Sequence, residues 1–299
     1  MKKKIYIAGC GGMLGEAFFK QFKEDYHLKC TDIDVNDDWL SYCDFRDFKQ
    51  YEKDVCDFQS ECLIHLGAYT DLEFCELNAD DTYVTNTLSV ENACYISNKL
   101  KIPIIYISTA GIFDGAKEVY DDWDIPNPLC HYSRSKYAGE VFVQKQVQNH
   151  LIARAGWMMG AGPKKDKKFV QKIIQQIKNG EKELYVVDDK FGTPTYTQDF
   201  AKNVKLLLEK EFWGVYNMVC EGVTSRLEVA QEILNILTLQ DEIKITKVTS
   251  EFFKKEYFTK RPSSERLICK KLELRNLSVM RHWKTALKEY LDEYYCDYI

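Results

Sequence analysis

The fold is decided near the N-terminus, by Lys4-Ile5-Tyr6-Ile7-Ala8 followed at once by Gly9-Cys10-Gly11-Gly12-Met13-Leu14-Gly15. The first five residues are typical of a strand, and apolar positions at helical spacing predict a helix from about Met13 to Glu24. The glycines between them allow a tight turn and a close approach of the backbone to a pyrophosphate at the helix N-terminus. The stretch therefore predicts a dinucleotide-binding loop in which Gly9 to Gly15 contact the cofactor.

Strand and helix patterns alternate through the first half of the chain. Further strands are expected at His27–Thr31, Cys62–Leu66, Ile104–Ile107 and Leu151–Arg154, with helices near 80–99 and 133–149. This alternation predicts an α/β protein with a Rossmann doubly wound parallel sheet and a smaller, mostly C-terminal α/β substrate-binding cap. We place the NAD(P)-binding domain at 1–160, with returning segments near 188–220, and the substrate-binding domain mostly at 161–299.

Composition excludes several classes of protein. The 299 residues are 45% hydrophobic and 29% charged, which rules out wholesale disorder. A net charge of −5 gives no basic footprint for nucleic acid, and no apolar run reaches the length of a membrane span. The eleven cysteines include no Cys-x-x-Cys pair, so we expect no metal site. We interpret them as reduced thiols packed as small apolar side chains, which favours the cytoplasm.

Asp32 ends the second expected strand, where a carboxylate can accept hydrogen bonds from a ribose 2′-hydroxyl and would repel a 2′-phosphate. The alternative is that Asp32 only begins a turn with Asp34 and Asn36. We favour cofactor binding and expect NADH, or both NADH and NADPH, to serve, because Lys29 is the only cation at that strand end. A methyltransferase with a similar sheet is the competing class, but it would not need the tyrosine and lysine described next.

Two segments match Tyr-x-x-x-Lys, and their context separates them. Tyr95 and Lys99 lie inside an expected helix before the fourth strand, where packing explains them. Tyr132 and Lys136 follow the strand that ends in Thr109, and their spacing places both on one helix face. An ammonium beside a phenol lowers its pKa, so Tyr132 can act as general acid or base. Thr109 can polarise a carbonyl, which suits hydride transfer from a nicotinamide.

These residues resemble the extended short-chain dehydrogenase/reductase family, and further segments narrow the resemblance to the dTDP-4-dehydrorhamnose reductase family across nearly the whole chain. The segments that carry it are Leu66-Gly67-Ala68-Tyr69-Thr70, Asn86, Ser108-Thr109-Ala110-Gly111-Ile112-Phe113-Asp114-Gly115, Tyr132–Glu140, Arg154-Ala155-Gly156-Trp157, Phe191-Gly192-Thr193-Pro194-Thr195 and Arg261-Pro262. The resemblance implies reduction of the 4-keto group of a nucleotide-linked 6-deoxy sugar with NADH or NADPH, in the synthesis of surface polysaccharide precursors. The resemblance is also compatible with a homodimer.

The same resemblance implies roles for individual residues. Thr109, Tyr132 and Lys136 match the catalytic trio, and Lys136 also holds the nicotinamide ribose. Cofactor contacts are implied for the glycine loop, Asp32, Asp44, Phe45, Leu66, Gly67 and Ala68. Ser108 and Trp157 fall near the substrate sugar, although a core position explains Trp157 equally well. Arg261, whose planar fork suits phosphate, is a candidate for the substrate diphosphate. The run Lys164–Lys168 is a second candidate, with a solvated loop as the favoured interpretation.

One departure affects the substrate. The family carries Asp and Tyr after its Ser-Thr pair, whereas this chain has Ala110 and Gly111. We therefore expect an altered or broader choice of sugar. The same two residues argue against a nucleotide-sugar 4,6-dehydratase, because they supply no acid or base. A non-catalytic regulatory subunit, similar to that of methionine adenosyltransferase, is the alternative function, which the intact trio disfavours without excluding.

Overall fold

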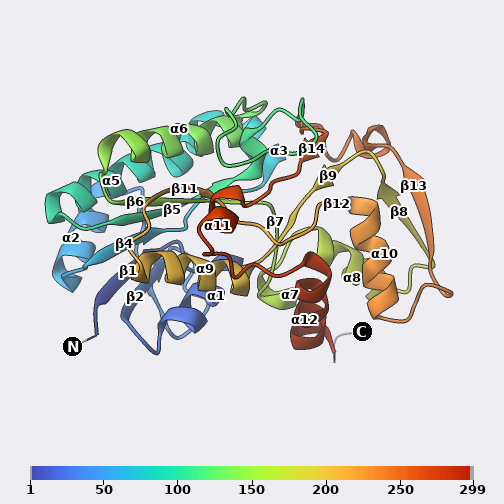
Figure 1. The fold of residues 1–299 in the computed structure, drawn as a ribbon, viewed down its shortest axis with the longest axis horizontal. Helices are drawn as coiled ribbons and strands as arrows, with labels where there is room; N and C mark the ends of the chain where they lie inside the picture. Colours follow the sequence, from blue (N-terminus) through green and yellow to red (C-terminus); the bar gives the residue numbers. More distant parts are fainter. Residues whose placement is uncertain (1, 297–299) are drawn as a thin grey trace.

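A seven-stranded parallel sheet organises the larger part of the protein, in the computed structural model that describes residues 2–296 (Figure 1). The strand order is β11-β6-β5-β4-β1-β2-β3, and every neighbouring pair is parallel. The strands are β1 (Lys4–Ala8), β2 (His27–Asp32), β3 (Leu40–Tyr42), β4 (Cys62–His65), β5 (Ile104–Thr109), β6 (His150–Ala155) and β11 (Gly214–Asn217). The strand order reverses between β1 and β4, and in sheets of this kind ligands bind beyond the carboxyl ends of the strands at such a point. The predicted doubly wound parallel sheet is thus confirmed.

Helices cover both faces of this sheet. In β1, Ile5 and Ile7 pack with the face that carries α1 and α9, while Tyr6 and Ala8 pack with the opposite face. The helices on the first face are α1 (Met13–Phe22) and α9 (Thr197–Glu209), and those on the second are α2 (Phe48–Phe58), α5 (Ser89–Leu100) and α6 (His131–Gln146). The sheet is therefore buried on both sides, which explains its apolar strands.

The helix expected near 80–99 is interrupted. The structure has α3 (Leu72–Leu77), α4 (Ala79–Tyr83), a π-helical turn at Val84–Leu88 and then α5. Asn86 in this turn is fully buried. Its Oδ1 accepts from the Tyr69 amide at 2.8 Å, and its Nδ2 donates to the Tyr69 carbonyl at 3.1 Å and the Ser135 hydroxyl at 3.1 Å. The wider turn thus joins the loop after β4 to α6, which carries the expected tyrosine and lysine.

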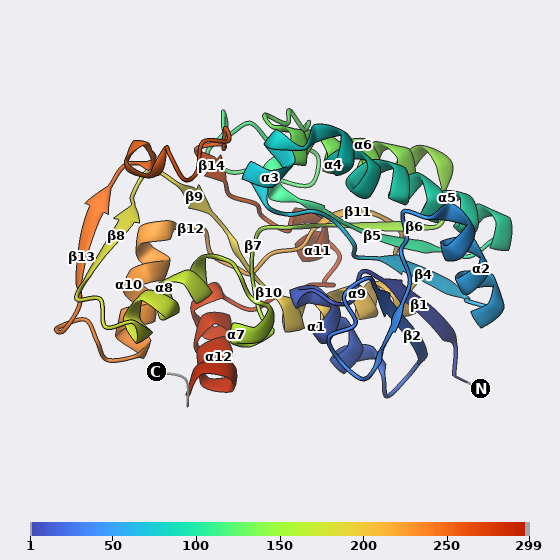
Figure 2. The ribbon, with the colours of Figure 1, turned by 180° about the vertical axis from the view of Figure 1, so that it is seen from behind.

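The smaller part lies at one end of the molecule, at the right of Figure 1 and the left of Figure 2. Its strands form three short sheets. They are β7 (Trp157–Met159) with β10 (Pro194–Tyr196), β8 (Glu183–Val187) with β13 (Lys244–Val248), and β9 (Phe191–Gly192) between β12 (Thr224–Ser225) and β14 (Ser264–Glu265). Its helices are α7 (Gly162–Lys165), α8 (Phe169–Lys178), α10 (Arg226–Ile236) and α12 (Trp283–Tyr295), with a 3-10 turn at Ser250–Phe253. The short helix α11 (Lys270–Leu274) lies beside β11 of the large sheet, and a second 3-10 turn at Ala110–Ile112 follows β5. Among residues 2–296, no helix has both the length and the apolar character to cross a membrane.

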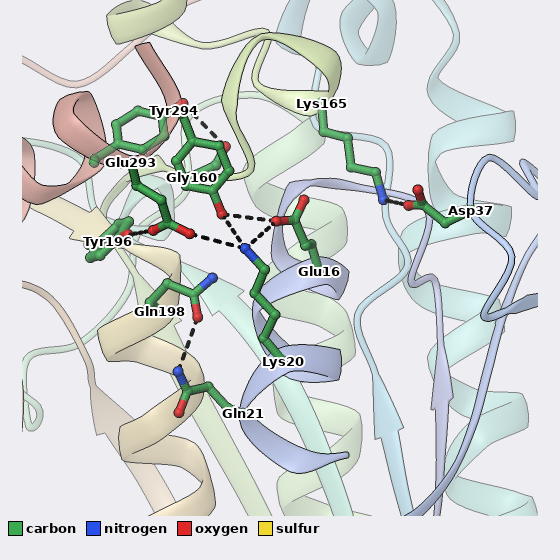
Figure 3. Close-up of polar contacts among 11 residues, drawn as sticks. Glu16, Lys20, Gln21, Asp37, Gly160, Lys165, Tyr196, Gln198, Glu293 and Tyr294 are labelled. Atoms are coloured by element: carbon green, nitrogen blue, oxygen red, sulfur yellow. Dashed lines mark hydrogen bonds and ion pairs between the residues drawn. The ribbon is translucent and has the colours of Figure 1, made fainter. Parts of the chain in front are cut away.

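Polar contacts attach α12 to α1 (Figure 3). The Lys20 ammonium lies 2.8 Å from a carboxylate oxygen of Glu16 and 3.1 Å from one of Glu293. It also donates to the Tyr294 hydroxyl at 2.9 Å, and the Tyr196 hydroxyl donates to Glu293 at 2.9 Å. Helix α12 is thereby fixed against α1, the first helix of the part built on the large sheet, and this contact helps to hold the smaller part beside the sheet.

Candidate active site

The loop between β1 and α1 is a cradle whose shape requires glycine. Gly9 has a φ of +81°, and a Cβ there would lie 2.2 Å from the Gly67 amide nitrogen. A Cβ on Gly15 would lie 2.0 Å from the Cys10 carbonyl oxygen, whereas one on Gly12 would meet nothing within 4 Å. The loop therefore packs tightly against the segment after β4 and is open beside Gly12. This shape, at the start of a helix, fits a dinucleotide pyrophosphate.

The Asp32 carboxylate forms hydrogen bonds both within a turn and to the glycine loop. Its Oδ2 accepts a hydrogen bond from the Gly11 amide at 2.8 Å, and its Oδ1 accepts one from the Asp34 amide at 2.9 Å. The carboxylate thus begins a turn and also faces the glycine loop, where the adenosine ribose of a dinucleotide would lie. Lys29 is directed elsewhere, since its ammonium pairs with Asp54 of α2.

The other expected cofactor contacts surround the same cradle. Leu66 follows β4 and donates its amide to the Ala8 carbonyl at 2.8 Å. The Phe45 ring covers Gly67, where a Cβ would lie 2.2 Å from ring atom Cε1. The Arg46 guanidinium pairs with Asp44 at 2.8 Å and holds the pKa of that carboxyl below its usual value. The side chains of Cys10 and Leu14 are packed in the core, so only their backbone atoms are placed to contact a cofactor.

The catalytic candidates meet where β5 ends and α6 begins. Thr109 is the last residue of β5, and its Oγ1 accepts from the Gly111 amide at 3.1 Å. Tyr132 lies in the first turn of α6 and hydrogen-bonds to the Thr109 side chain. Burial raises the pKa of the Tyr132 phenol above its usual value, and the bond to Thr109 acts in the opposite direction. The phenol is therefore held protonated beside a threonine hydroxyl.

Lys136 lies one turn further along α6 in an almost closed environment. Lys136 is 4% exposed, and its Nζ lies 4.3 Å from the centroid of the Tyr106 ring. Burial lowers the pKa of Lys136 to about 7, and the Glu140 carboxylate partly offsets this effect. Glu140 is itself fully buried and pairs with Arg154 at 2.5 Å. Lys136 can therefore change its charge near neutral pH.

The second Tyr-x-x-x-Lys match lies outside this site. Tyr95 is 59% exposed on α5 and packs edge-on against Phe48. Lys99 pairs with Glu52 at 3.0 Å on the surface. The hydrogen bond to Glu52 raises the pKa of Lys99, in contrast to the lowered pKa of Lys136.

The three residues that we expected to contact the substrate differ in the hydrogen bonds that their side chains form. Ser108 is 3% exposed, and its hydroxyl has no hydrogen-bond partner among residues 2–296. Trp157 donates its indole Nε1–H to Glu265 at 2.8 Å. Arg261 is already engaged, because its guanidinium donates to Glu73 at 2.7 Å and to the Thr259 carbonyl at 3.1 Å.

The basic run is not the solvated loop that we favoured. The Lys165 side chain is 3% exposed and pairs with Asp37, as Figure 3 shows, and Lys164 pairs with the same carboxylate at 2.8 Å. Lys168 donates to the Thr70 carbonyl and hydroxyl, both at 3.0 Å. These lysines therefore attach α7 and its flank to loops of the nucleotide-binding half.

Two side chains at this site had no signal in the sequence. Glu265 comes from β14, and its carboxylate reaches both Trp157 and Gly111. Arg226 begins α10, and its guanidinium lies 3.7 Å from the centroid of the Trp157 ring. Both residues come from regions without a recognisable motif, so only the fold places them beside the trio.

Comparison with known proteins gives consistent matches over the whole chain. The family model described as RmlD substrate binding domain matches residues 2–296. A dTDP-4-dehydrorhamnose reductase structure from Clostridium acetobutylicum is 31% identical, with a TM-score of 0.88, covering 97% of this chain and 99% of that one. A dTDP-4-dehydrorhamnose reductase structure from Bacillus anthracis, in complex with NADP, is 27% identical with a TM-score of 0.88, covering 98% and 100%. The spore coat polysaccharide biosynthesis protein SpsK of Bacillus subtilis is 28% identical over 292 residues, or 97% of each chain.

Proposed function

The chain belongs to the RmlD substrate binding domain family and is an NAD(P)-dependent oxidoreductase, and on that premise we propose the reaction that it catalyses. The reaction is reduction of the 4-keto group of a nucleotide-linked 6-deoxy sugar, dTDP-4-dehydrorhamnose or a related compound, for surface polysaccharide precursors. One observation carries the proposal: Thr109, Tyr132 and Lys136 gather at the end of β5 and the start of α6, at the carboxyl edge that also holds the glycine cradle.

The trio is arranged to deliver a proton to an oxygen that becomes negative. A nicotinamide cofactor, when bound, supplies the hydride. Thr109 Oγ1 accepts from the Gly111 amide, and when substrate binds its hydroxyl proton can turn from Tyr132 to the substrate oxygen. Tyr132 keeps its proton in the buried site and gives it from Oη to the new alkoxide.

Lys136 adjusts the acidity of this proton donor. When its Nζ is protonated, the positive charge on the same helix face favours the phenolate and so eases release of the proton. Its lowered pKa makes that charge sensitive to pH near neutrality. We also assign Lys136 the role of binding the nicotinamide ribose, as the family resemblance implies.

The free cysteines support a location in the cytoplasm, which we include in the proposal. Ten of the eleven cysteines are buried or partly buried, and none of those that the structure describes forms a disulfide. A reducing compartment keeps such thiols free.

The test is a panel of nucleotide-linked 4-keto-6-deoxy sugars, beginning with dTDP-4-dehydrorhamnose, assayed for oxidation of NADH and NADPH. We expect turnover of at least one sugar, with the nucleotide sugar reduced at C4. Binding of cofactor without turnover of any sugar would instead favour a non-catalytic regulatory subunit, the alternative that the intact trio opposes.

A further inference from the structure

The Glu265 carboxylate lies beside the trio without being part of it. Its residue is half-buried in β14, which pairs with β9 so that Glu265 is opposite Gly192. A Cβ built on Gly111 would lie 3.4 Å from Glu265 Oε1, 3.5 Å from Thr109 Oγ1 and 3.7 Å from Ser133 Oγ. A side chain at 111 would therefore project into the space beside both this carboxylate and Thr109.

One oxygen of this carboxylate is engaged and the other is free. Oε2 accepts from Trp157 Nε1 at 2.8 Å. Oε1 accepts no hydrogen bond and forms no ion pair within the part of the chain that the structure describes. The negative charge is also close enough to contribute to the raised pKa of Tyr132. A carboxylate oxygen so placed is an acceptor for a hydroxyl group of a ligand.

Trp157 is packed against Arg226 and Gly192, which restrains the carboxylate that it binds. The Arg226 guanidinium stacks on one side of the indole at 3.7 Å from the ring centroid, and it also lies 4.7 Å from the Phe169 ring. Gly192 lies against the indole so closely that a Cβ there would be 2.3 Å from Trp157 Cε2. Glu265 is therefore preorganised by a rigid partner rather than free to rotate away.

We propose that Glu265 is a specificity-determining residue, whose Oε1 accepts a hydrogen bond from a sugar hydroxyl next to the reacting carbonyl. Gly111 leaves space beside this carboxylate, because a Cβ there would already be in contact with Oε1 at 3.4 Å and a longer side chain would crowd it. This inference rests on the proposed function. A site that binds a hydroxyl with a buried polar group rejects analogues lacking it far more strongly than an apolar wall does.

The test compares the wild-type enzyme with Glu265→Gln. Glutamine conserves the volume and leaves an oxygen for Trp157 Nε1, but it places a donor NH₂ group where the free acceptor was. We expect kcat/KM for the preferred keto sugar to fall at least tenfold. The ratio of this kcat/KM to that of the sugar epimeric at the neighbouring hydroxyl should fall by a similar factor. The KM for the cofactor should not change. Glu118→Gln is the matched control, since Glu118 is an exposed carboxylate paired with Arg266 at 3.1 Å.

A second variant addresses the space beside Glu265. Gly111 is not in the left-handed region, so a side chain there adds no backbone strain. Gly111→Leu should narrow the same epimer preference by displacing the carboxylate. Combined with Glu265→Gln it should add little, because both changes remove one interaction.

Direct binding separates this inference from the proposed function. With cofactor present, Glu265→Gln should raise the Kd of dTDP-L-rhamnose at least tenfold. The Kd of dTDP, which lacks the sugar, should stay unchanged. Unaltered epimer ratios and unaltered dTDP-L-rhamnose binding in Glu265→Gln would overturn the inference while turnover by the wild type upholds the function. Sugar-dependent binding that Glu265→Gln weakens, without turnover of any keto sugar, would uphold the contact between Glu265 and the sugar and overturn the proposed reaction.

Discussion

Replacing Lys136 by methionine should stabilise the cofactor-free protein while abolishing its activity. The folded chain holds the pKa of Lys136 at about 7 by burial, against a usual value of 10.5. Between these two pH values the unfolded chain carries a proton on Lys136 that the folded chain has lost, so the free energy of unfolding rises with pH. At about 1.4 kcal/mol per pH unit, the full interval corresponds to a cost of about 5 kcal/mol at pH 7 and below.

Methionine removes this cost because it is apolar, similar in length and adaptable in packing. The stability difference between the variant and the wild type should therefore be largest at or below pH 7 and should shrink toward pH 10.5. Urea unfolding without cofactor, followed by tryptophan fluorescence from pH 6.5 to 10, measures it. Lys99→Met is the matched control, because Lys99 lies on the surface in the second Tyr-x-x-x-Lys segment. Equal stabilities at pH 7, or a difference that does not fall with rising pH, would refute the reasoning.

Three further outcomes follow from the site. Tyr132→Phe should lower kcat by about 10²- to 10⁴-fold with cofactor binding retained, because only the proton donor is lost. Tyr95→Phe should leave kcat within about threefold of the wild type, far below that range. NADH should give a higher kcat/KM than NADPH, since Asp32 faces the expected position of a 2′-phosphate, and a strong preference for NADPH would contradict this assignment. Glu140→Ala should lower the free energy of unfolding by about 3–5 kcal/mol in urea titrations, because it leaves the Arg154 charge buried without a partner.

The elements that sequence predicted best are those whose pattern is local and long enough to repeat. The bounds of β1 agree with the expected Lys4–Ala8, and those of β2 differ from the expected His27–Thr31 by one residue. The π-helical turn at Val84–Leu88 was missed, because the pattern of apolar residues continues through it while Asn86 bonds to Tyr69 and Ser135. Two-residue strands such as β9 were not predictable either, since their hydrogen bonds depend on partners distant in sequence.

The core of the candidate site was predictable for a similar reason. The glycine loop and the Tyr132–Lys136 spacing are local patterns with a physical purpose, and their order along the chain distinguishes them from chance matches. The difference between Lys136 and Lys99, by contrast, is burial. One is 4% exposed beside an aromatic ring, and the other pairs with a carboxylate on the surface. Context after a buried strand indicated which pair to choose, but only the fold shows why one ammonium has a lowered pKa.

The position of Glu265 in the candidate site could not be predicted from the sequence. The presence of Ala110 and Gly111 where the family has Asp and Tyr indicates a changed pocket, but it does not indicate which side chain occupies the vacated space. The answer depends on the register of β14 against β9, because a shift by one residue would turn Glu265 away from Gly111 and bring Ser264 or Arg266 into its place. Trp157, which fixes the carboxylate, is 108 positions away in sequence. On our proposal that Glu265 binds the sugar, its recognition depends on the pairing of two short strands, and changes of register in β14 should alter substrate choice before they alter the hydride-transfer chemistry.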